Sequence, residues 1–283
     1  MLLINEYSVV IWFLNSYKIG IIGAGKLGKC IIKGFIKAGI EPNKIIASTS
    51  SEKSLESLKP LDINLTLDNS YLVENSDIII STLKPLKVIE IFRKIALVIK
   101  QKIVISTAAL IPLRAYKQIL GDAEIYRAMP NICVEINKGF IPICGNKKEN
   151  AEAIEKILGL LGEVEWVDED TLDKFTLLSA SIPALITEII DAMELAALEL
   201  GIPNELSKKA IRNVLIGTAE LYREKDLIAI RNDIATPKGI TIKLLLNSLR
   251  SNVKLSIIDT LINTSKELDN LINYYDKIIK LNL

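Results

Sequence analysis

The amino-acid sequence predicts an α/β fold, in which a doubly wound parallel sheet is followed by an all-helical domain. Strand and helix patterns alternate through the first half of the 283 residues, which is typical of a sheet covered by helices on both faces. A glycine-rich turn joins the first strand to the first helix, and strand patterns end near residue 168. We therefore expect an N-terminal extension at residues 1–17, a sheet domain at 18–168 and a helical domain at 169–283.

The individual elements follow from the spacing of apolar residues. Short apolar runs predict strands at residues 18–22, 44–48, 63–66, 77–82, 102–106, 124–128, 138–144 and 163–167. Helical spacing between them predicts helices at residues 26–38, 52–58, 69–75, 87–99, 112–119 and 149–161. Longer helices are then predicted at residues 172–200, 205–223, 241–249 and 252–279. Because segment 183–200 is apolar nearly all round, we expect it to be buried on every side, in a subunit interface.

The loop after the first strand has three glycines at the spacing of a dinucleotide-binding turn. Gly23 permits the tight turn, Gly25 lets the backbone approach a pyrophosphate, and Gly28 lets the helix pack close to the strand. Since the loop lies between a strand and a helix, as in a Rossmann-type domain, Lys26 and Leu27 are expected to bind phosphate with the glycines. The alternative is a glycine-rich turn that binds nothing.

The end of the second predicted strand indicates which dinucleotide binds. An acidic residue there would hydrogen-bond a ribose 2′-hydroxyl and indicate NAD, but the chain has hydroxyl side chains at Ser48, Thr49 and Ser50, with Lys53 nearby. These residues favour the 2′-phosphate of NADPH, with NADH as the second choice. A serine-rich turn with Ser50 or Ser51 as a helix N-cap is also compatible with the pattern.

Further candidate cofactor-binding residues follow the later strands of the sheet. The carboxyl ends of strands form the ligand crevice in an open α/β sheet, so residues at these ends should lie near the dinucleotide. Those predicted to bind the cofactor are Thr82, Lys84, Pro85, Ala108, Met129, Pro130 and Asn131.

Composition excludes several kinds of site. The chain has no histidine, which excludes a Ser-His-Asp triad, a Cys-His dyad and the usual zinc sites, and no metal is expected. A net charge of +1 gives no reason to expect a nucleic-acid or membrane partner. Cys30, Cys133 and Cys144 lack C-x-x-C spacing and are expected to be reduced thiols of a cytoplasmic protein. The apolar stretch at 9–14 is too short to span a bilayer, and no other segment is expected to span one.

Four motifs occur in order along the chain: the glycine loop at 23–28, Leu-Lys-Pro at 83–85, Arg-Ala-Met-Pro-Asn at 127–131 and Thr-Pro-Lys-Gly-Ile-Thr-Ile at 236–242. Together they resemble the Δ1-pyrroline-5-carboxylate reductase family, and the resemblance spans residues 18 to about 270. It implies reduction of a small cyclic imine to proline with NAD(P)H, the last step of proline synthesis. It also implies a homodimer formed through the helical domain, or a larger assembly of such dimers.

The resemblance further implies roles for residues of the substrate site. Thr241 matches a threonine that lies near the imine nitrogen, and Lys84 and Glu224 match polar residues around the substrate. The loop that binds the substrate carboxylate corresponds to Thr236, Lys238, Gly239 and Ile240.

Departures from the family pattern leave the exact substrate open. The family usually has glycine where this chain has Lys238 and Ile182, tyrosine at Leu185 and threonine at Ile132. One alternative is a β-hydroxyacid dehydrogenase or a related imine or ketone reductase. The catalytic lysine that such dehydrogenases have on the first long helix of the second domain is missing from segment 182–200. Another alternative is a non-catalytic NADP(H)-binding regulatory protein.

Overall fold

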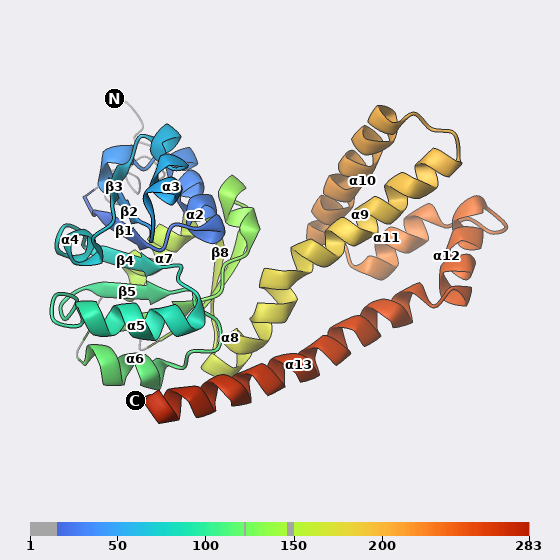
Figure 1. The fold of residues 1–283 in the computed structure, drawn as a ribbon. Coiled ribbons are helices and arrows are strands. Elements are labelled where there is room, and N and C mark those ends of the chain that lie inside the picture. The colour runs from blue at the N-terminus through green and yellow to red at the C-terminus, as the bar shows by residue number, and fades with distance from the viewer. Residues whose placement is uncertain (1–15, 122, 146–149, 283) are drawn as a thin grey trace. The chain divides into compact units, whose positions relative to one another are not determined.

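The computed structural model of the chain describes residues 16–121, 123–145 and 150–282 (Figure 1). Contacts divide these residues into two compact units. The sheet unit contains the residues up to Ser181 together with those from Glu267 onward, and the helical unit is Ile182–Lys266. This division differs from the predicted boundary at 168/169, because the segment that follows residue 168 is hydrogen-bonded to the sheet. The predicted extension at 1–17 lies outside the described residues, apart from Ser16 and Tyr17.

The sheet unit is built on one eight-stranded sheet with the order β3-β2-β1-β4-β5-β6-β7-β8. The strands are β1 Ile19–Ile22, β2 Ile45–Ser48, β3 Asn64–Thr66, β4 Ile78–Ser81, β5 Ile103–Ser106, β6 Glu124–Ala128, β7 Gly139–Gly145 and β8 Gly162–Trp166. The predicted doubly wound, parallel sheet is confirmed, and one pair departs from the parallel pattern, because β6 and β7 are antiparallel. Only a short 3₁₀ turn, η3 Ile132–Ile136, lies between these two strands, and a parallel return needs a longer crossover.

Helices cover both faces of the sheet. Those of the sheet unit are α2 Lys26–Lys37, α3 Glu52–Glu56, α4 Asn69–Glu74, α5 Pro85–Ile95, α6 Leu113–Leu120, α7 Ala151–Gly159 and α8 Glu169–Phe175. Alternate strand residues such as Ile21 and Ile80 pack with α2 and α7, whereas Ile22 and Ile79 pack with α4, α5 and α6 (Figure 1). Burial on both faces explains why the central strands are continuous apolar runs.

The strand order reverses between β1 and its two neighbours, β2 and β4. From β1 the chain proceeds to β2 on one side, and later to β4 on the other. Ligands of open α/β sheets bind outside the carboxyl ends of the strands at such a switch point. The predicted glycine loop follows β1 directly and therefore lies at this position.

The helical unit contains α9 Ile182–Glu199, α10 Asn204–Glu224, α11 Leu227–Ile234, α12 Ile240–Arg250 and the first part of α13 Val253–Asn282. Gly201 ends α9 with φ of +76°, as expected from the Gly-Ile-Pro stop signal. Helix α11 was not predicted, because it has only eight residues and follows a run of charged residues. A π-helical turn at Thr176–Ser181 precedes α9.

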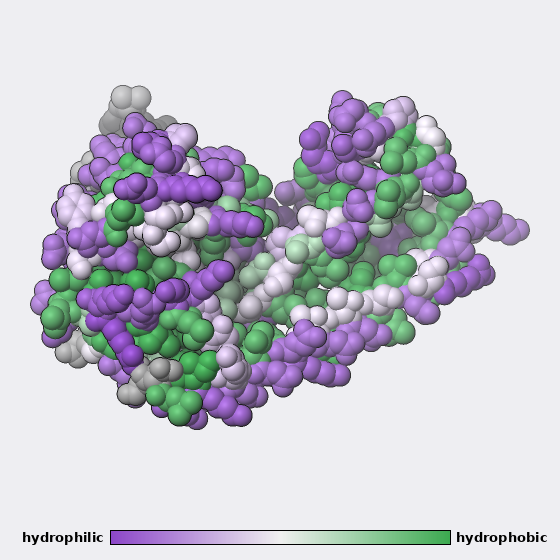
Figure 2. Space-filling view, in the orientation of Figure 1, coloured by the Kyte–Doolittle hydropathy of each residue, from purple (hydrophilic) through white to green (hydrophobic). Residues whose placement is uncertain are grey.

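Segment 183–200 is exposed or half-buried along most of its length in the single chain, and its predicted burial in a subunit interface stays a prediction. Ala197 is the one buried residue of α9, and apolar residues gather on the surface of the helical unit (Figure 2). The stretch Glu169–Glu199 is long and apolar enough to cross a membrane by length and composition, with 6% of its apolar window buried. Apolar helices of soluble proteins pass the same test of length and composition, so this finding does not contradict the expectation that no segment spans a membrane.

Candidate active site

The glycine loop is held against the end of β2 by backbone hydrogen bonds. The N–H groups of Gly23 and Ala24 donate to the carbonyl of Ser48 at 3.1 and 2.8 Å. Gly23 has φ of +82°, a conformation that L-residues rarely adopt. The loop therefore has the tight turn expected from its sequence.

The amino end of α2 has the properties of a phosphate-binding site. Gly25 is the N-cap and supplies no side chain, and the first turn of α2 contains no acidic residue. Among the described residues other than its chain neighbours, a Cβ added at Gly25 would have only the carbonyl oxygen of Gly23 within 4 Å, at 3.7 Å, so the space beside the backbone is open. Backbone N–H groups and the positive end of a 12-residue helix attract an anion there. The residues present therefore fit a dinucleotide pyrophosphate.

Gly28 and Thr82 determine how closely α2 packs on the sheet. A Cβ at Gly28 would lie 2.8 Å from Oγ1 of Thr82 and 3.4 Å from the side chain of Ile21. The Thr82 hydroxyl itself donates to the carbonyl of Gly23 at 2.7 Å. Thr82, predicted to bind the cofactor, thus supports the glycine loop with its side chain.

The hydroxyl groups at the end of β2 differ in their availability. Ser48 is buried and donates to Oδ1 of Asn69 at 2.6 Å, and Thr49 donates to the carbonyl of Ser51 at 3.0 Å. Ser51 is the N-cap of α3, as the serine-turn interpretation predicted. Ser50 is exposed and has no hydrogen-bond partner within the described residues.

Two residues at this end of the sheet add to the sequence-based prediction. Asn69 is the first residue of α4, shortly after β3, and was not predicted as a site residue. Its side-chain oxygen Oδ1 accepts the hydrogen bond that the Ser48 hydroxyl donates. Its only sequence signal is the Asp-Asn pair that starts a helix. Lys53 is exposed and has no ion-pair partner in the described part of the chain.

Lys84 and Pro85 form the start of a second helix at the crevice. Lys84 is exposed and is the N-cap of α5 through its backbone, and its carbonyl accepts from the N–H of Lys87 at 3.0 Å. Pro85 is the first residue of α5, so this helix begins two residues before the predicted start at 87. Proline favours this position because it lacks the N–H group that would be unpaired there.

The ends of β5 and β6 carry the remaining predicted cofactor residues. Ala108, Met129 and Pro130 are buried, and the N–H of Met129 donates to the carbonyl of Pro142 at 2.9 Å. Asn131 caps η3 by accepting the N–H of Cys133 at 3.1 Å, and its amide donates to Oγ of Ser179 at 3.3 Å. These segments are therefore fixed by contacts within the sheet unit.

Arg127 is buried and paired. It donates to Glu169 at 2.7 Å and to Asp173 at 2.5 Å. Burial alone would lower the pKa of Arg127, but the hydrogen bond and charge of Asp173, with the Glu169 hydrogen bond, outweigh burial and raise it. Arg127 is therefore a structural ion-pair partner that joins β6 to α8. Sequence reasoning did not identify Glu169 or Asp173.

The predicted substrate loop belongs to the helical unit and forms a tight turn. The N–H of Gly239 donates to the carbonyl of Thr236 at 3.0 Å, with Pro237 second in the turn. Lys238 is third and has φ of +64°, as in a type II turn, where glycine is preferred. A Cβ on Gly239 would overlap Oγ1 of Thr236. Gly239 is the N-cap of α12, which begins at Ile240 without a side-chain cap.

Two hydroxyls of the loop are available for a ligand. Thr236 is exposed and Thr241 is half-buried, and neither side chain has a partner within the described residues. Glu224 ends α10 and is exposed, and the neighbouring Lys225 pairs with Asp233 at 2.8 Å. The structure thus places Thr236, Thr241 and Glu224 in the helical unit, whereas Lys84 belongs to the sheet unit.

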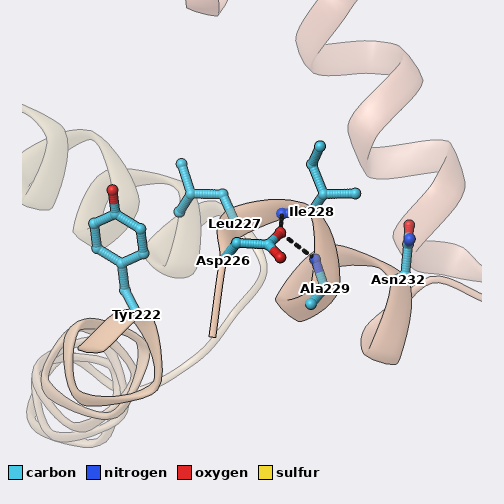
Figure 3. A pocket seen from close by; sticks show the side chains of 6 residues that line it. All are labelled: Tyr222, Asp226, Leu227, Ile228, Ala229 and Asn232. Atoms are coloured by element: carbon cyan, nitrogen blue, oxygen red, sulfur yellow. Dashed lines mark hydrogen bonds between the residues drawn. The ribbon is translucent and has the colours of Figure 1, made fainter. Parts of the chain in front are cut away.

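The residues that line a pocket of about 670 Å³ are near Glu224 in the sequence, but Glu224 is not one of them. Tyr222, Asp226 and Leu227 line one part of it (Figure 3). The Asp226 carboxylate accepts the N–H groups of Ile228 and Ala229 at 2.8 and 2.9 Å, which caps α11 (Figure 3). The Asp226 carboxylate is therefore committed to the helix start, and Tyr222 and Asn232 supply the other polar side chains of the pocket.

Two of the cysteines are protected from reaction. Cys30 is buried and donates to Glu135 at 3.1 Å, and burial together with this contact raises its pKa to about 11. Burial raises the pKa of Cys144 to about 12. Both remain protonated at neutral pH, and the described cysteines are free thiols, as expected.

Comparisons with known proteins connect both parts of the chain to one family. Residues 18–110 match the family described as NADP oxidoreductase, coenzyme F420-dependent, and residues 169–271 match pyrroline-5-carboxylate reductase dimerisation. A pyrroline-5-carboxylate reductase of Methanosarcina acetivorans is 30% identical over 262 residues, covering 89% of this chain and 97% of that protein.

Solved structures agree with the fold. A pyrroline-5-carboxylate reductase from Coxiella burnetii has a TM-score of 0.76 and 27% identity, covering 89% of this chain and 98% of that one. The Plasmodium falciparum enzyme, solved with NADP bound, has a TM-score of 0.80 at 22% identity, covering 92% of this chain and 98% of that one, and supports the fold. With the glycine loop, the helical unit and a 30% identical relative aligned over nearly its whole length, the chain belongs to the pyrroline-5-carboxylate reductase family.

Proposed function

We propose that the chain reduces Δ1-pyrroline-5-carboxylate to proline with NADPH. The observation that carries this proposal is the family membership over both units, combined with an uncapped, open phosphate site at Gly25. When bound, NADPH supplies the hydride that reduces the carbon–nitrogen double bond. The task of the protein is therefore to bind and orient two anionic small molecules.

The sheet unit holds the cofactor. The N–H groups of Lys26, Leu27 and Gly28 bind the pyrophosphate, and Gly25 leaves room for it. Exposed Ser50 and Lys53 bind the 2′-phosphate, since β2 ends without an acidic residue. We expect kcat/KM to be higher with NADPH than with NADH, and a clear preference for NADH would contradict the assignment of these two residues.

The helical unit holds the substrate. The N–H groups that open α12 at Ile240 and Thr241 bind the carboxylate, and the turn at Lys238 and Gly239 orients them. The Thr236 hydroxyl adds a hydrogen bond to the carboxylate, and the Thr241 hydroxyl donates to the imine nitrogen. Solvent protonates the imine, which removes the need for a histidine.

Lys84 and Glu224 have supporting roles. Both side chains are exposed and have no ion-pair partner within the described residues, so their charges are available to a ligand. Lys84 attracts the anionic substrate and cofactor, and Glu224 stabilises the protonated imine by its negative charge.

The test is a pair of threonine variants. Thr241→Val keeps the shape and removes the hydroxyl donor, and we expect kcat/KM to fall roughly ten- to a thousandfold, with NADPH affinity unchanged. Thr236→Val should mainly raise KM, because it weakens carboxylate binding. Thr260→Val is the matched control, since its hydroxyl donates to the carbonyl of Ser256 within α13. Near-full turnover of Thr241→Val would mean that this residue only begins a helix.

Two other functions remain distinguishable by the same assay. A β-hydroxyacid dehydrogenase or a related ketone reductase would oxidise NADPH with the corresponding ketone and not with the imine. A non-catalytic NADP(H)-binding protein would bind NADPH and oxidise none. These tests are needed because three positions differ from the usual residues of the family: Ile182, Leu185 and Lys238.

The exposed apolar face of the helical unit indicates self-association. Residues 169–271 match a dimerisation domain, and the apolar stretch Glu169–Glu199 falls within it. A second copy of the chain therefore covers this stretch in place of lipid, and dimers assemble further into a larger soluble, cytoplasmic oligomer. Sedimentation of the purified protein would reveal a dimer or a multiple of dimers, whereas a monomer or a requirement for detergent would contradict this arrangement.

A further inference from the structure

A buried ion cluster joins β6 to α8. The side chain of Arg127 is 1% exposed, and its two terminal nitrogens donate to Glu169 at 2.7 Å and to Asp173 at 2.5 Å. Glu169 and Asp173 lie one turn apart and therefore share a face of α8. A guanidinium this deeply buried needs charged partners, so the cluster fixes α8 against the end of the strand.

Glu169 also determines where α6 begins. Glu169 Oε1 accepts hydrogen bonds from two groups: the Arg127 guanidinium and the N–H of Leu113, the first residue of α6, which donates at 2.7 Å. The N–H groups of a first helical turn have no partner inside the helix, and a negative charge is favourable there. One carboxylate of α8 thus connects β6 to the end of the loop at 107–112.

The loop at 107–112 has a backbone conformation that is unfavourable for an unconstrained chain. Leu110 has φ of +67°, which is unusual for a bulky L-residue, and its side chain is buried. At the start of the loop, the N–H of Thr107 donates to the carbonyl of Ser81 at 2.9 Å, and that of Ala108 donates to Oγ of Ser106 at 3.3 Å. With both ends fixed, Leu110 keeps its left-handed backbone.

This loop lies where the second half of a dinucleotide would extend. The phosphate site follows β1, and the adenosine end is assigned to β2, so the nicotinamide half points toward β4 and β5. Thr107, Ala108 and Ala109 follow β5 and precede the strained Leu110.

We infer that Arg127 and Glu169 are positioning residues, which hold the loop at 107–112 in the shape that receives the nicotinamide half of the cofactor. Neither side chain touches the cofactor in this arrangement, and both act through the backbone of the loop. The inference rests on the proposed function, because it takes NADPH as the bound cofactor.

The test compares three carboxylate variants of α8 for NADPH affinity and for amide hydrogen exchange of the cofactor-free protein. Glu169→Ala should raise the NADPH Kd at least tenfold and speed exchange at Leu113 and Ala108 at least tenfold. Glu169→Gln keeps an acceptor for the Leu113 N–H and should restore slow exchange and most of the affinity. Asp170→Ala is the matched control, because Asp170 is an exposed carboxylate of the same helical turn.

The outcomes separate this inference from the proposed function. Faster exchange in Glu169→Ala with an unchanged Kd would overturn it, as would an equal loss of affinity in Asp170→Ala. If Glu169→Ala does not fold, Glu169→Gln decides alone: slow exchange at Leu113 with a Kd close to wild type supports the inference, and slow exchange with a Kd raised at least tenfold overturns it. Wild-type protein that binds NADPH but leaves the imine unreduced would refute the proposed substrate and leave this inference intact.

Discussion

Replacement of Gly25 by serine should abolish dinucleotide binding without unfolding the protein. The position is open in the structure, because in the described part of the chain, beyond its two neighbours, a Cβ there meets only one oxygen within 4 Å, at 3.7 Å. Its φ of −79° is common for L-residues, whereas its ψ of −147° lies outside the α and β regions, so serine adds backbone strain of about 1 kcal/mol. Serine is a good N-cap for α2 and offsets part of this strain, so the free energy of unfolding should fall by no more than about 1 kcal/mol.

The loss of binding follows from the same geometry. The serine oxygen would accept N–H groups at the start of α2, and its side chain would occupy the space that the pyrophosphate needs. Hydrogen bonds from backbone N–H groups to a charged acceptor contribute about 1.5–3 kcal/mol each. Losing two of them corresponds to an NADPH Kd raised by roughly a hundred- to ten-thousandfold.

Two further glycines calibrate the measurement. At Gly159 in α7 a Cβ would meet no described atom within 4 Å beyond its own helix backbone and chain neighbours, so Gly159→Ser should change neither stability nor NADPH affinity. At Gly28 a Cβ would lie 2.8 Å from Thr82, so overpacking in Gly28→Ala should lower the free energy of unfolding by about 1–3 kcal/mol. The higher helix propensity of alanine should offset about 1 kcal/mol of this loss. Titration of NADPH fluorescence and urea unfolding without cofactor measure the two effects. A folded Gly25→Ser variant that binds NADPH within about threefold of wild type would refute the phosphate site.

The other predictions concern the substrate turn and the cysteines. Lys238→Gly should raise the free energy of urea unfolding by about 0.5–1 kcal/mol, since it relieves a φ of +64°; a decrease would show that the Lys238 side chain makes stabilising contacts. Gly239→Ala should raise KM for the imine and leave NADPH Kd unchanged, because its methyl group would overlap Thr236; an unchanged KM would remove this turn from the site. Stability should fall as pH rises from 9.0 to about 11, because unfolded thiols ionise while folded Cys30 stays protonated, and Cys30→Ala should flatten the decline. Iodoacetamide at neutral pH should modify Cys133 before Cys30 or Cys144, as mass spectrometry of the peptides would detect.

The sheet could be predicted because its elements are encoded locally. A four-residue apolar run such as β1 has few alternatives once a glycine turn and a helical pattern follow it. The same reasoning predicted the turn and the open space of the proposed phosphate site, since Gly23, Gly25 and Gly28 act through their own backbone. Strand β7 was predicted at residues 138–144, but its antiparallel direction was not, because strand direction depends on the path of the chain between strands, which local periodicity does not contain.

Hydroxyl side chains were harder to assign than glycines. Ser48 and Thr82 have the residue type and position of cofactor ligands, but their hydroxyls donate to Asn69 and Gly23, which are 21 and 59 residues away in sequence. A sequence pattern identifies a donor and does not identify which acceptor lies next to it. Only the folded sheet brings these partners together.

The sequence by itself determined the two-part architecture, the phosphate loop and the motifs of the family, because each depends on neighbouring residues. Tertiary structure decided what buried charges do. The sequence showed Arg127 only as the first residue of the motif at 127–131. Its partners Glu169 and Asp173 lie 42 and 46 residues further along the chain. A buried guanidinium must find carboxylates wherever the fold provides them, and that requirement is satisfied only by packing α8 on the end of β6.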